Sequence, residues 1–503
     1  MWGTEYREIE LYGWKDGTKK QEQNWRGIRM KPLIYPVKTP FGYYFYETQR
    51  NEIIAVNEEL YERIVNWDSE EAEDAQTKRE VDREVKELKE LGYLNEPYIE
   101  KLEHPATKYL DIMLERKVSK ILLQLTQRCN LRCQYCVYSE EKNLGTRIHS
   151  NKDMSYETAK QAIDFYMEHS VDCDEKGIGF YGGEPLLQFD LIKKIITYCN
   201  EVFRGHKIIY SITTNGTLLT DEIIDFLVKN QVYLTVSLDG PKDIHDKNRK
   251  FANGIGSYDM VTRNLERLKH KCEDKMKCAV NMVVDPDNSY QEISDFFHEP
   301  ILKDIDVRWN LVEEENDIKS VGEQFVSTYE YRTFLGYVRY FREKNFDAPD
   351  GLVKGEFEDR ATEDFHFQPF FLPGVSVPGG PCIPGKVRPL VDCDGRLFPC
   401  ERVSETSSCT NIGSLNEGFD IEKVSRFLNI SQITEECRNC WAFVLCSVCA
   451  KHAVDGNILC ANMKRKQCAG ARENAWKQIM SRILLYENMV HEKNMRKIKE
   501  GIF

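Results

Sequence analysis

Residues 120–136 read KILLQLTQRCNLRCQYC, an apolar stretch followed at once by three cysteines with the spacing Cys-x3-Cys-x2-Cys. The cysteines are Cys129, Cys133 and Cys136. The apolar stretch predicts a buried β-strand, and thiols placed directly after it predict a soft-metal site at the end of that strand. Four thiolates complete a structural zinc site, whereas three leave one metal position open for another ligand.

Composition limits where this metal site operates. The chain has 503 residues, 41% of them hydrophobic, a formal net charge of -13 and 17 cysteines. This length is sufficient for two or three packed domains. The sequence shows neither a secretion signal nor an apolar stretch long enough to span a membrane, so we predict a cytoplasmic protein. In that reducing compartment the cysteines favour metal or redox chemistry over disulfides, and the acidic balance argues against a nucleic-acid partner.

Between residues 115 and 320, six short apolar stretches alternate with amphipathic helical segments. The stretches are KILLQLTQ, GIGFYGG, IIYSITTNG, YLTVSLDG, KCAVNMVVD and DVRWNLVEE. This alternation predicts an α/β fold whose parallel strands curl into a partial (β/α)6 barrel. Functional residues are expected at the carboxyl ends of the strands, where the motifs GGE, TNG and SLDG follow the second, third and fourth stretches.

Other segments flank the predicted barrel. Residues 1–29 lack periodicity and are interpreted as a tail or an unused upstream translation start. Residues 30–104 combine a three-stranded meander with a helix capped by Asn57 and a second helix from Glu70 to Leu91, a winged-helix-like module. Residues 321–375 are predicted to bridge two domains. Residues 376–470 hold ten of the 17 cysteines and are predicted to fold around metal, and residues 471–503 predict an amphipathic helix with a basic end.

The Cys129, Cys133, Cys136 motif, with Tyr135 before its last cysteine, resembles the signature of the radical S-adenosylmethionine (SAM) superfamily. The resemblance implies that the three cysteines bind a 4Fe-4S cluster whose free iron chelates SAM. It also implies that one electron, from a donor such as flavodoxin or ferredoxin, cleaves SAM to a 5'-deoxyadenosyl radical. The cofactor contacts implied by the resemblance are Tyr135, Gly182, Gly183, Glu184, Thr214, Asn215, Ser237, Asp239 and Arg249.

The residues alone leave other interpretations of this site open. The three cysteines also fit a zinc knuckle. The polar residues after each strand also fit Asx turns that close a strand, and Arg249 also fits a solvated loop arginine or a contact to substrate.

The C-terminal cysteines resemble the SPASM extension of peptide-modifying radical enzymes, which implies two auxiliary 4Fe-4S clusters and three clusters in all. We assign Cys382, Cys400 and Cys449 to the first, with Cys393 or a vacant iron completing it. The second is assigned to Cys437, Cys440, Cys446 and Cys468, with Cys460 as the alternative to Cys468. The x2 spacing before Cys449 departs from the usual x3, and zinc is the competing interpretation. Cys409 has no assigned role, and ordinary buried or partly buried thiols are expected at Cys173, Cys199, Cys272 and Cys278.

Residues 30–104 resemble the peptide-recognition element fused to maturases of ribosomally made peptides. An exposed strand edge beside a helix can bind a leader segment by β-augmentation. Together the three parts resemble a ranthipeptide or sactipeptide maturase, an oxidoreductase that installs a thioether between a donor cysteine and a carbon of a Cys-rich precursor peptide. The alternatives are a carbon-carbon crosslinking maturase, an anaerobic sulfatase-maturating enzyme and a non-catalytic iron-sulfur protein. For the N-terminal module the alternative is a packing or dimerisation role.

Overall fold

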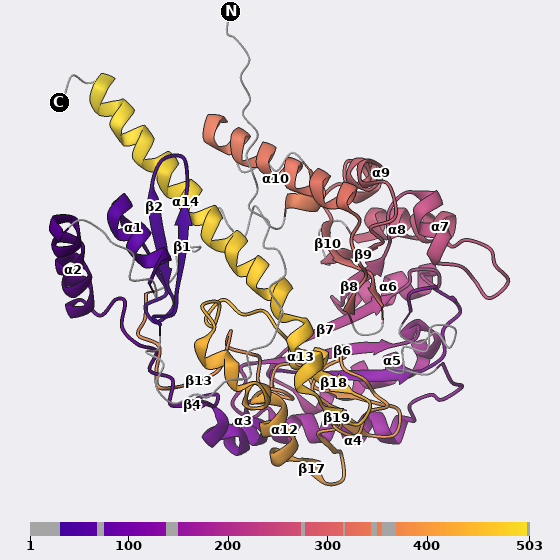
Figure 1. The fold of residues 1–503 in the computed structure, drawn as a ribbon. Coiled ribbons are helices and arrows are strands. Elements are labelled where there is room, and N and C mark those ends of the chain that lie inside the picture. Colours follow the sequence, from indigo (N-terminus) through magenta and orange to yellow (C-terminus); the bar gives the residue numbers. More distant parts are fainter. Residues whose placement is uncertain are drawn as a thin grey trace, which may run out of the picture.

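The computed structural model describes residues 31–67, 75–136, 149–272, 277–314, 317–343, 350–354 and 369–499. At its centre six parallel strands lie side by side in chain order (Figure 1). They are β5 (Lys120–Thr126), β6 (Glu175–Gly182), β7 (Lys207–Thr214), β8 (Tyr233–Ser237), β9 (Cys278–Val284) and β10 (Asp306–Leu311). Each falls on one of the six apolar stretches, so the predicted α/β fold with a partial (β/α)6 barrel is confirmed.

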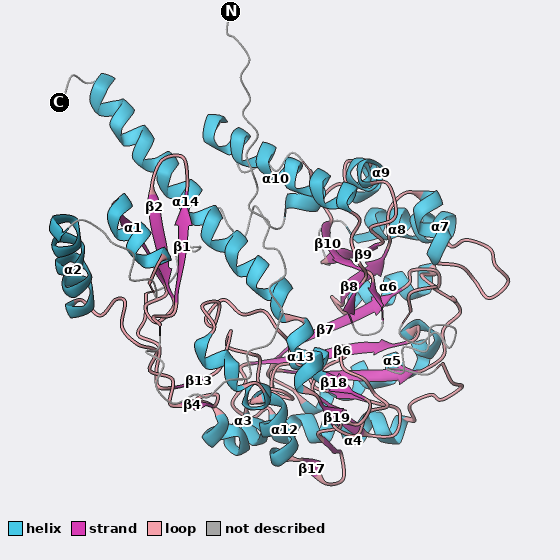
Figure 2. Ribbon diagram, viewed as in Figure 1, coloured by secondary structure: helices cyan, strands magenta, loops and turns pink. Residues whose placement is uncertain are grey.

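Helices separate the strands and cover the barrel (Figure 2). The helices are α4 (Tyr156–His169), α5 (Phe189–Val202), α6 (Asp221–Lys229), α7 (Lys242–Asn248), α8 (Tyr258–Cys272) and α9 (Tyr290–Phe296). The Ser155 hydroxyl accepts from the Thr158 amide at 2.9 Å and so caps α4. Nearly every residue of β5 is buried, which explains its unbroken apolar sequence.

Short strands from the cysteine-rich region extend the barrel sheet, and the sequence did not predict them. β14 (Leu390–Val391) pairs in parallel with β5, with Leu390 opposite Leu122. β15 (Arg396–Phe398), β16 (Gly413–Ser414) and β17 (Gly418–Phe419) then continue in antiparallel pairs to make a ten-stranded sheet. Strands of two or three residues carry no readable periodicity. The cysteine-rich region is therefore joined to the barrel through backbone hydrogen bonds.

The N-terminal module has the predicted meander. β1 (Ile34–Lys38), β2 (Tyr43–Glu47) and β3 (Glu52–Val56) form an antiparallel sheet in that order. α1 (Glu58–Val65) is capped by Asn57, whose side chain accepts from the Leu60 amide at 2.8 Å, and α2 (Ala75–Glu90) follows. Glu70, the predicted start of that second helix, lies outside the described residues.

Both faces of this three-stranded sheet are covered. Phe45 packs with Leu60 of α1 on one face. On the other face Tyr44 and Tyr46 pack against Ile479 and Ile483 of α14 (Cys468–Lys499), the long C-terminal helix that passes beside the module in Figure 1. The module is therefore docked on the helix predicted for the end of the chain.

The predicted bridging region contributes α10 (Glu323–Glu343), whose Tyr329 ring lies 6.2 Å from the Trp309 ring of β10, while residues 344–349 and 355–368 lie outside the described residues. No helix in the described part of the chain is long and apolar enough to cross a bilayer. The remaining helices are α3 (Leu110–Arg116), α12 (Ile421–Leu428) and α13 (Ala461–Lys466). The remaining strand pairs join β4 (Lys101–Leu102) with β13 (Val375–Ser376), β11 (Glu313–Glu314) with β12 (Asp317–Ile318), and β18 (Val454–Asp455) with β19 (Ile458–Leu459).

Candidate active site

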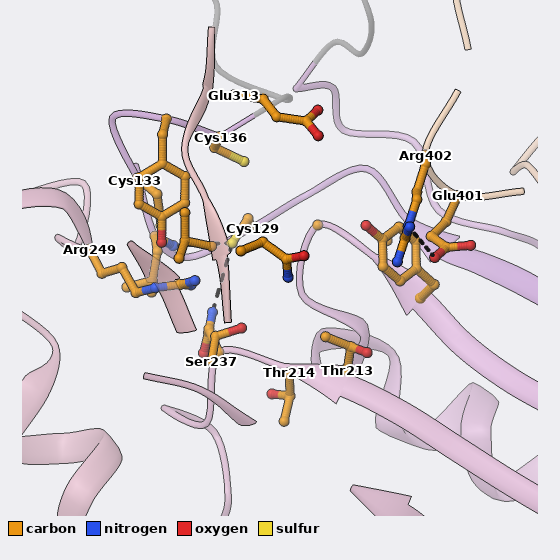
Figure 3. Close-up of a pocket in the computed structure, with 18 of the residues that line it drawn as sticks. Cys129, Cys133, Cys136, Thr213, Thr214, Ser237, Arg249, Glu313, Glu401 and Arg402 are labelled. Carbon is orange, nitrogen blue, oxygen red and sulfur yellow. Dashed lines mark hydrogen bonds and ion pairs between the residues drawn. The ribbon is translucent and has the colours of Figure 1, made fainter. Parts of the chain in front are cut away.

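A cavity of about 390 Å³ lies at the carboxyl ends of β5 to β8, between the barrel and the cysteine-rich region (Figure 3). Ten of the twelve residues predicted for the SAM site line it: Cys129, Cys133, Tyr135, Cys136, Gly182, Gly183, Thr214, Asn215, Ser237 and Arg249. The other two, Glu184 and Asp239, are 0% and 1% exposed and lie behind the lining. The structure thus brings the predicted residues together in one place.

Backbone hydrogen bonds hold the cysteine loop against its neighbours. The Gly183 amide donates to the Thr126 carbonyl at 2.9 Å, and the Arg132 amide donates to the Lys250 carbonyl at 2.7 Å. The loop is therefore fixed on one side by the end of β6 and on the other by the segment after α7. The three thiols that it carries face the cavity.

The glycine pair after β6 allows this close approach. A Cβ atom on Gly183 would lie 2.2 Å from the Arg128 carbonyl oxygen, and one on Gly182 would lie 2.3 Å from the Thr126 carbonyl oxygen. Gly182 also has a φ of +135°, which side chains disfavour. Both glycines are needed for the backbone packing that positions Cys129.

The donor set fits a 4Fe-4S cluster. Burial raises the pKa of the Cys129 and Cys133 thiols to about 12, so the thiolates depend on a metal to stabilise them. The Leu131 backbone amide lies 3.4 Å from the Cys129 sulfur, and the side-chain amide nitrogen of Asn215 lies 3.8 Å from it. Thiolate ligands commonly accept hydrogen bonds from such N–H groups. In the described ranges no three His, Cys, Asp or Glu side chains converge on a single ion.

Glu184, predicted as a cofactor contact, is fully buried behind the cavity lining. Its carboxylate accepts hydrogen bonds from the Thr214 hydroxyl and the Asn215 amide, both at 2.7 Å, and from the Leu186 amide at 3.0 Å. Burial raises its pKa to about 7. The side chain therefore joins the end of β6 to the end of β7, and the Gly182 and Gly183 backbone faces the cavity instead.

Asp239 is also buried behind the cavity, where it holds residues that line the cavity. It accepts hydrogen bonds from Arg249 Nε at 2.8 Å, from the Val283 amide at 3.0 Å and from the Tyr135 hydroxyl. Burial alone would lower the pKa of Arg249, but the adjacent Asp239 carboxylate holds it well above its usual value. Arg249 is thus a fixed, buried cation on the cavity wall, which suits a carboxylate ligand.

The opposite wall carries charged residues that the sequence analysis missed (Figure 3). Lys451 pairs with Glu313 at 2.7 Å, which joins the cysteine-rich region to the strand β11. Glu401 accepts from Arg388 at 3.2 Å and neighbours Arg402. Glu401 and Arg402 directly follow Cys400 in the sequence, and this position could have predicted their place at the site. No motif marks Tyr181, Thr213, Val283, Asn310, Leu311, Glu313, Val403 or Lys451, which also line the cavity.

Residues 123–299, which include the cysteine loop and the ends of β6 to β8, match the Radical SAM superfamily model. This part of the chain is a radical SAM domain. A cysteine-type anaerobic sulfatase-maturating enzyme of Clostridium perfringens is 26% identical over 65% of this chain and 87% of its own length. An uncharacterized protein of Methanocaldococcus jannaschii is 42% identical over 27% of this chain, and the match spans 43% of that protein's length.

A solved structure shares the fold of this chain. It is native anSMEcpe with bound AdoMet and the Kp18Cys peptide, which matches 73% of this chain and 98% of its own with a TM-score of 0.52. The sequences are 19% identical in that alignment. The likeness extends beyond the part of the chain that matches the family model, which ends at residue 299.

Outside this cavity, several of the C-terminal cysteines lie near enough to one another to influence each other's pKa. Burial raises the pKa of the Cys382 and Cys400 thiols, and nearby Cys449 adds to both shifts. Burial likewise raises the pKa of Cys440, with smaller contributions from Cys437 and Cys468, and of Cys446, with contributions from Cys440 and Cys437. These influences link cysteines that the sequence assigned to the same cluster, and the ligand sets themselves stay a prediction.

The other cysteines lie elsewhere. Cys393, a possible fourth ligand of the first cluster, is buried and donates through its sulfur to the Gln124 carbonyl at 3.2 Å on β5. Cys409 lies 3.1 Å from the Ser407 hydroxyl, and Cys460 directly precedes α13. Buried or partly buried thiols were expected at the four remaining cysteines, and the structure agrees: Cys199 and Cys272 are buried, and Cys173 and Cys278 are half-buried.

Proposed function

We propose that the chain is a radical SAM maturase that installs thioether crosslinks in a Cys-rich, ribosomally made precursor peptide. One observation carries the proposal. A single cavity has Cys129, Cys133 and Cys136 on one wall, while Glu401 and Arg402, which follow Cys400 of the first C-terminal set, line the other. A peptide side chain in this cavity would lie between the proposed site of hydrogen removal and a metal that can bind a thiolate.

The residues fit three 4Fe-4S clusters. Cys129, Cys133 and Cys136 would hold the first, with SAM beside it, and the two C-terminal sets would hold the auxiliary clusters. When bound and reduced by flavodoxin or ferredoxin, the first cluster and SAM supply a 5'-deoxyadenosyl radical that removes a hydrogen atom from a carbon of the peptide.

The chain's own residues would bind and orient these groups. Arg249 would pair with the methionine carboxylate, and the Gly182 and Gly183 backbone would receive the amino group. Leu131, Val283 and Leu311 supply apolar surface that excludes water from the cavity. The charged side chains of Glu401, Arg402 and Lys451 would contact polar groups of the peptide backbone.

The N-terminal module would bind the leader of the precursor peptide. Its sheet has β1 and β3 at its edges. The ring of Tyr35 on β1 lies 4.1 Å from that of Trp441, next to Cys440, which places the module beside the second cysteine set. We infer that the leader pairs with the opposite edge, β3, by β-augmentation, and that binding raises the effective concentration of the core peptide at the cavity.

The test uses anaerobically reconstituted, reduced enzyme with SAM and the Cys-rich peptide encoded beside it. Mass spectrometry measures 5'-deoxyadenosine and peptide mass, with Cys129→Ala as the inactive control. A loss of two hydrogens per crosslink, with cysteines that no longer react with an alkylating reagent, is the expected result. The same mass loss with every thiol still reactive would replace the proposal with carbon-carbon crosslinking. Deoxyadenosine formation with an unchanged peptide would overturn the choice of substrate.

Sulfatase maturation is a second candidate, favoured by the match to a sulfatase-maturating enzyme over 65% of this chain. In that case the same cavity would accept a cysteine-containing sulfatase peptide and oxidise it to formylglycine. Labelling of such a peptide by a hydrazide probe would support this candidate. Absence of labelling under conditions in which deoxyadenosine forms would exclude it.

A further inference from the structure

Lys464 is a buried lysine within the second C-terminal cysteine set. It lies on α13 and is 3% exposed. Its ammonium group donates to the Cys437 sulfur at 3.2 Å and to the Thr434 hydroxyl at 2.8 Å. Thr434 is itself buried, and its hydroxyl lies 3.2 Å from the same sulfur. A cation, a hydroxyl and a thiol thus form a closed triangle in the interior.

No carboxylate of the described residues forms an ion pair with Lys464, although Glu436 is near enough to interact with its charge. Among the ion pairs of the described residues none includes Lys464, and the neighbouring Glu436 pairs instead with Arg465 at the surface. An isolated ammonium is costly to bury unless negative charge compensates it. The group in direct contact with the ammonium is the Cys437 sulfur at 3.2 Å, which as a thiolate would supply compensating negative charge.

We propose that Lys464 is a positioning residue that raises the reduction potential of the second auxiliary cluster. The inference rests on the proposed function, because it requires a 4Fe-4S cluster at Cys437, Cys440, Cys446 and Cys468. Reduction adds one electron to the cluster and breaks no bond. A buried cation and an N–H hydrogen bond to a ligand sulfur stabilise that added negative charge, and both are known determinants of cluster potentials.

The test is a potentiometric titration of reconstituted enzyme, with dithionite as the electron source, mediator dyes and detection by electron paramagnetic resonance. The component that disappears in Cys440→Ala identifies the second cluster. In Lys464→Met we expect the ratio of reduced to oxidised cluster at a fixed potential to fall at least tenfold, which is about 59 mV for a one-electron couple. Lys464→Arg keeps the charge and is expected to shift the ratio less.

Two further variants make the result decisive. Lys466→Met removes an exposed charge from the same helix and is expected to leave the potential unchanged. Lys464→Gln keeps a hydrogen-bond donor without the charge and is expected to hold wild-type iron while its potential falls. An unchanged potential at full iron content would overturn the inference. Loss of the cluster from Lys464→Met and Lys464→Gln, but not from Lys464→Arg, would also overturn it, since Lys464 would then retain the cluster rather than tune it.

A different outcome of the same experiment would contradict the proposed function. If every resonance component of the wild-type enzyme is unchanged in Cys440→Ala, neither lost nor altered, the second set holds no cluster and the proposed cofactor content is wrong. A component that disappears in that variant, yet keeps its potential in both charge-removing variants, would leave the proposed function intact and remove only the role of Lys464.

Discussion

A single added carbon atom at Gly183 would displace the cysteine loop. The methyl group of Gly183→Ala would overlap the Arg128 carbonyl oxygen, and a backbone atom moves only if the following Cys129 moves with it. We expect the variant to lose about four irons per chain and most of its deoxyadenosine formation, as measured by iron analysis and chromatography. Gly470→Ala is the control, because nothing lies within 4 Å of the added atom. Full iron content in Gly183→Ala would contradict this account of the glycine pair.

Glu47 is a second residue whose surroundings predict a measurable effect. Its side chain on β2 is 0% exposed and accepts from the Leu94 amide at 3.2 Å. Burial raises its pKa from 4.5 to about 7. The folded module therefore holds a proton that the unfolded chain has released, so stability is greatest below about pH 4.5 and declines until about pH 7. The loss amounts to about 3 kcal/mol.

Glu47→Gln is expected to remove this decline, because the amide carries no titrating proton. Hydrogen exchange of the β2 and β3 amides, measured by mass spectrometry between pH 5 and pH 8 and corrected for intrinsic rates, follows the effect in the intact chain. The exposed Glu59→Gln on α1 is the matched control and should behave as the wild type. An equal pH dependence in Glu47→Gln and the wild type would show that another group is responsible.

At the scale of elements, the cysteine loop after β5 and the second C-terminal set lie on separate parts of the fold. Substitutions in the two should therefore affect different activities. Cys129→Ala leaves the loop with two ligands, so SAM cleavage is expected to be lost. Cys440→Ala disturbs only the distant set, so cleavage should persist while peptide modification falls below detection. Mass spectrometry of both products in one reaction measures the two activities. Peptide modification at the native rate in Cys440→Ala would contradict the separation.

The elements also show what the sequence could predict. Each of the strands β5 to β10 is long enough to carry an apolar stretch, so position and order followed from the pattern. β14 has two residues, and its pairing with β5 depends on contacts between segments far apart in the chain. The same limit applies within the site. Spacing marked Cys129 and Asn215, whereas the inward turn of Glu184 and the approach of Glu401 and Lys451 depend on the assembled strands.

At the scale of the whole molecule, α14 connects the N-terminal module to the cysteine-rich region. Ile483 of α14 is 1% exposed and packs with Tyr44 and Tyr46 of the module. Ile483→Ala would remove buried methyl groups at a cost of about 2–5 kcal/mol. We expect faster hydrogen exchange in β1 and β2, and weaker peptide modification at low peptide concentration, with SAM cleavage unchanged. Met489→Ala, at an exposed position on the same helix, is the control.

The strand pairing between β14 and β5 bears on the form in which a substrate can arrive. β5, which leads into the cysteine loop, and β14 of the cysteine-rich region belong to one sheet. These two parts of the chain therefore cannot separate without breaking backbone hydrogen bonds. A cavity of about 390 Å³ between such fixed walls suits a peptide in extended form, presented one residue at a time. Crosslinks would then be installed before the peptide folds. A precursor whose cysteines already form disulfides would not fit into the cavity.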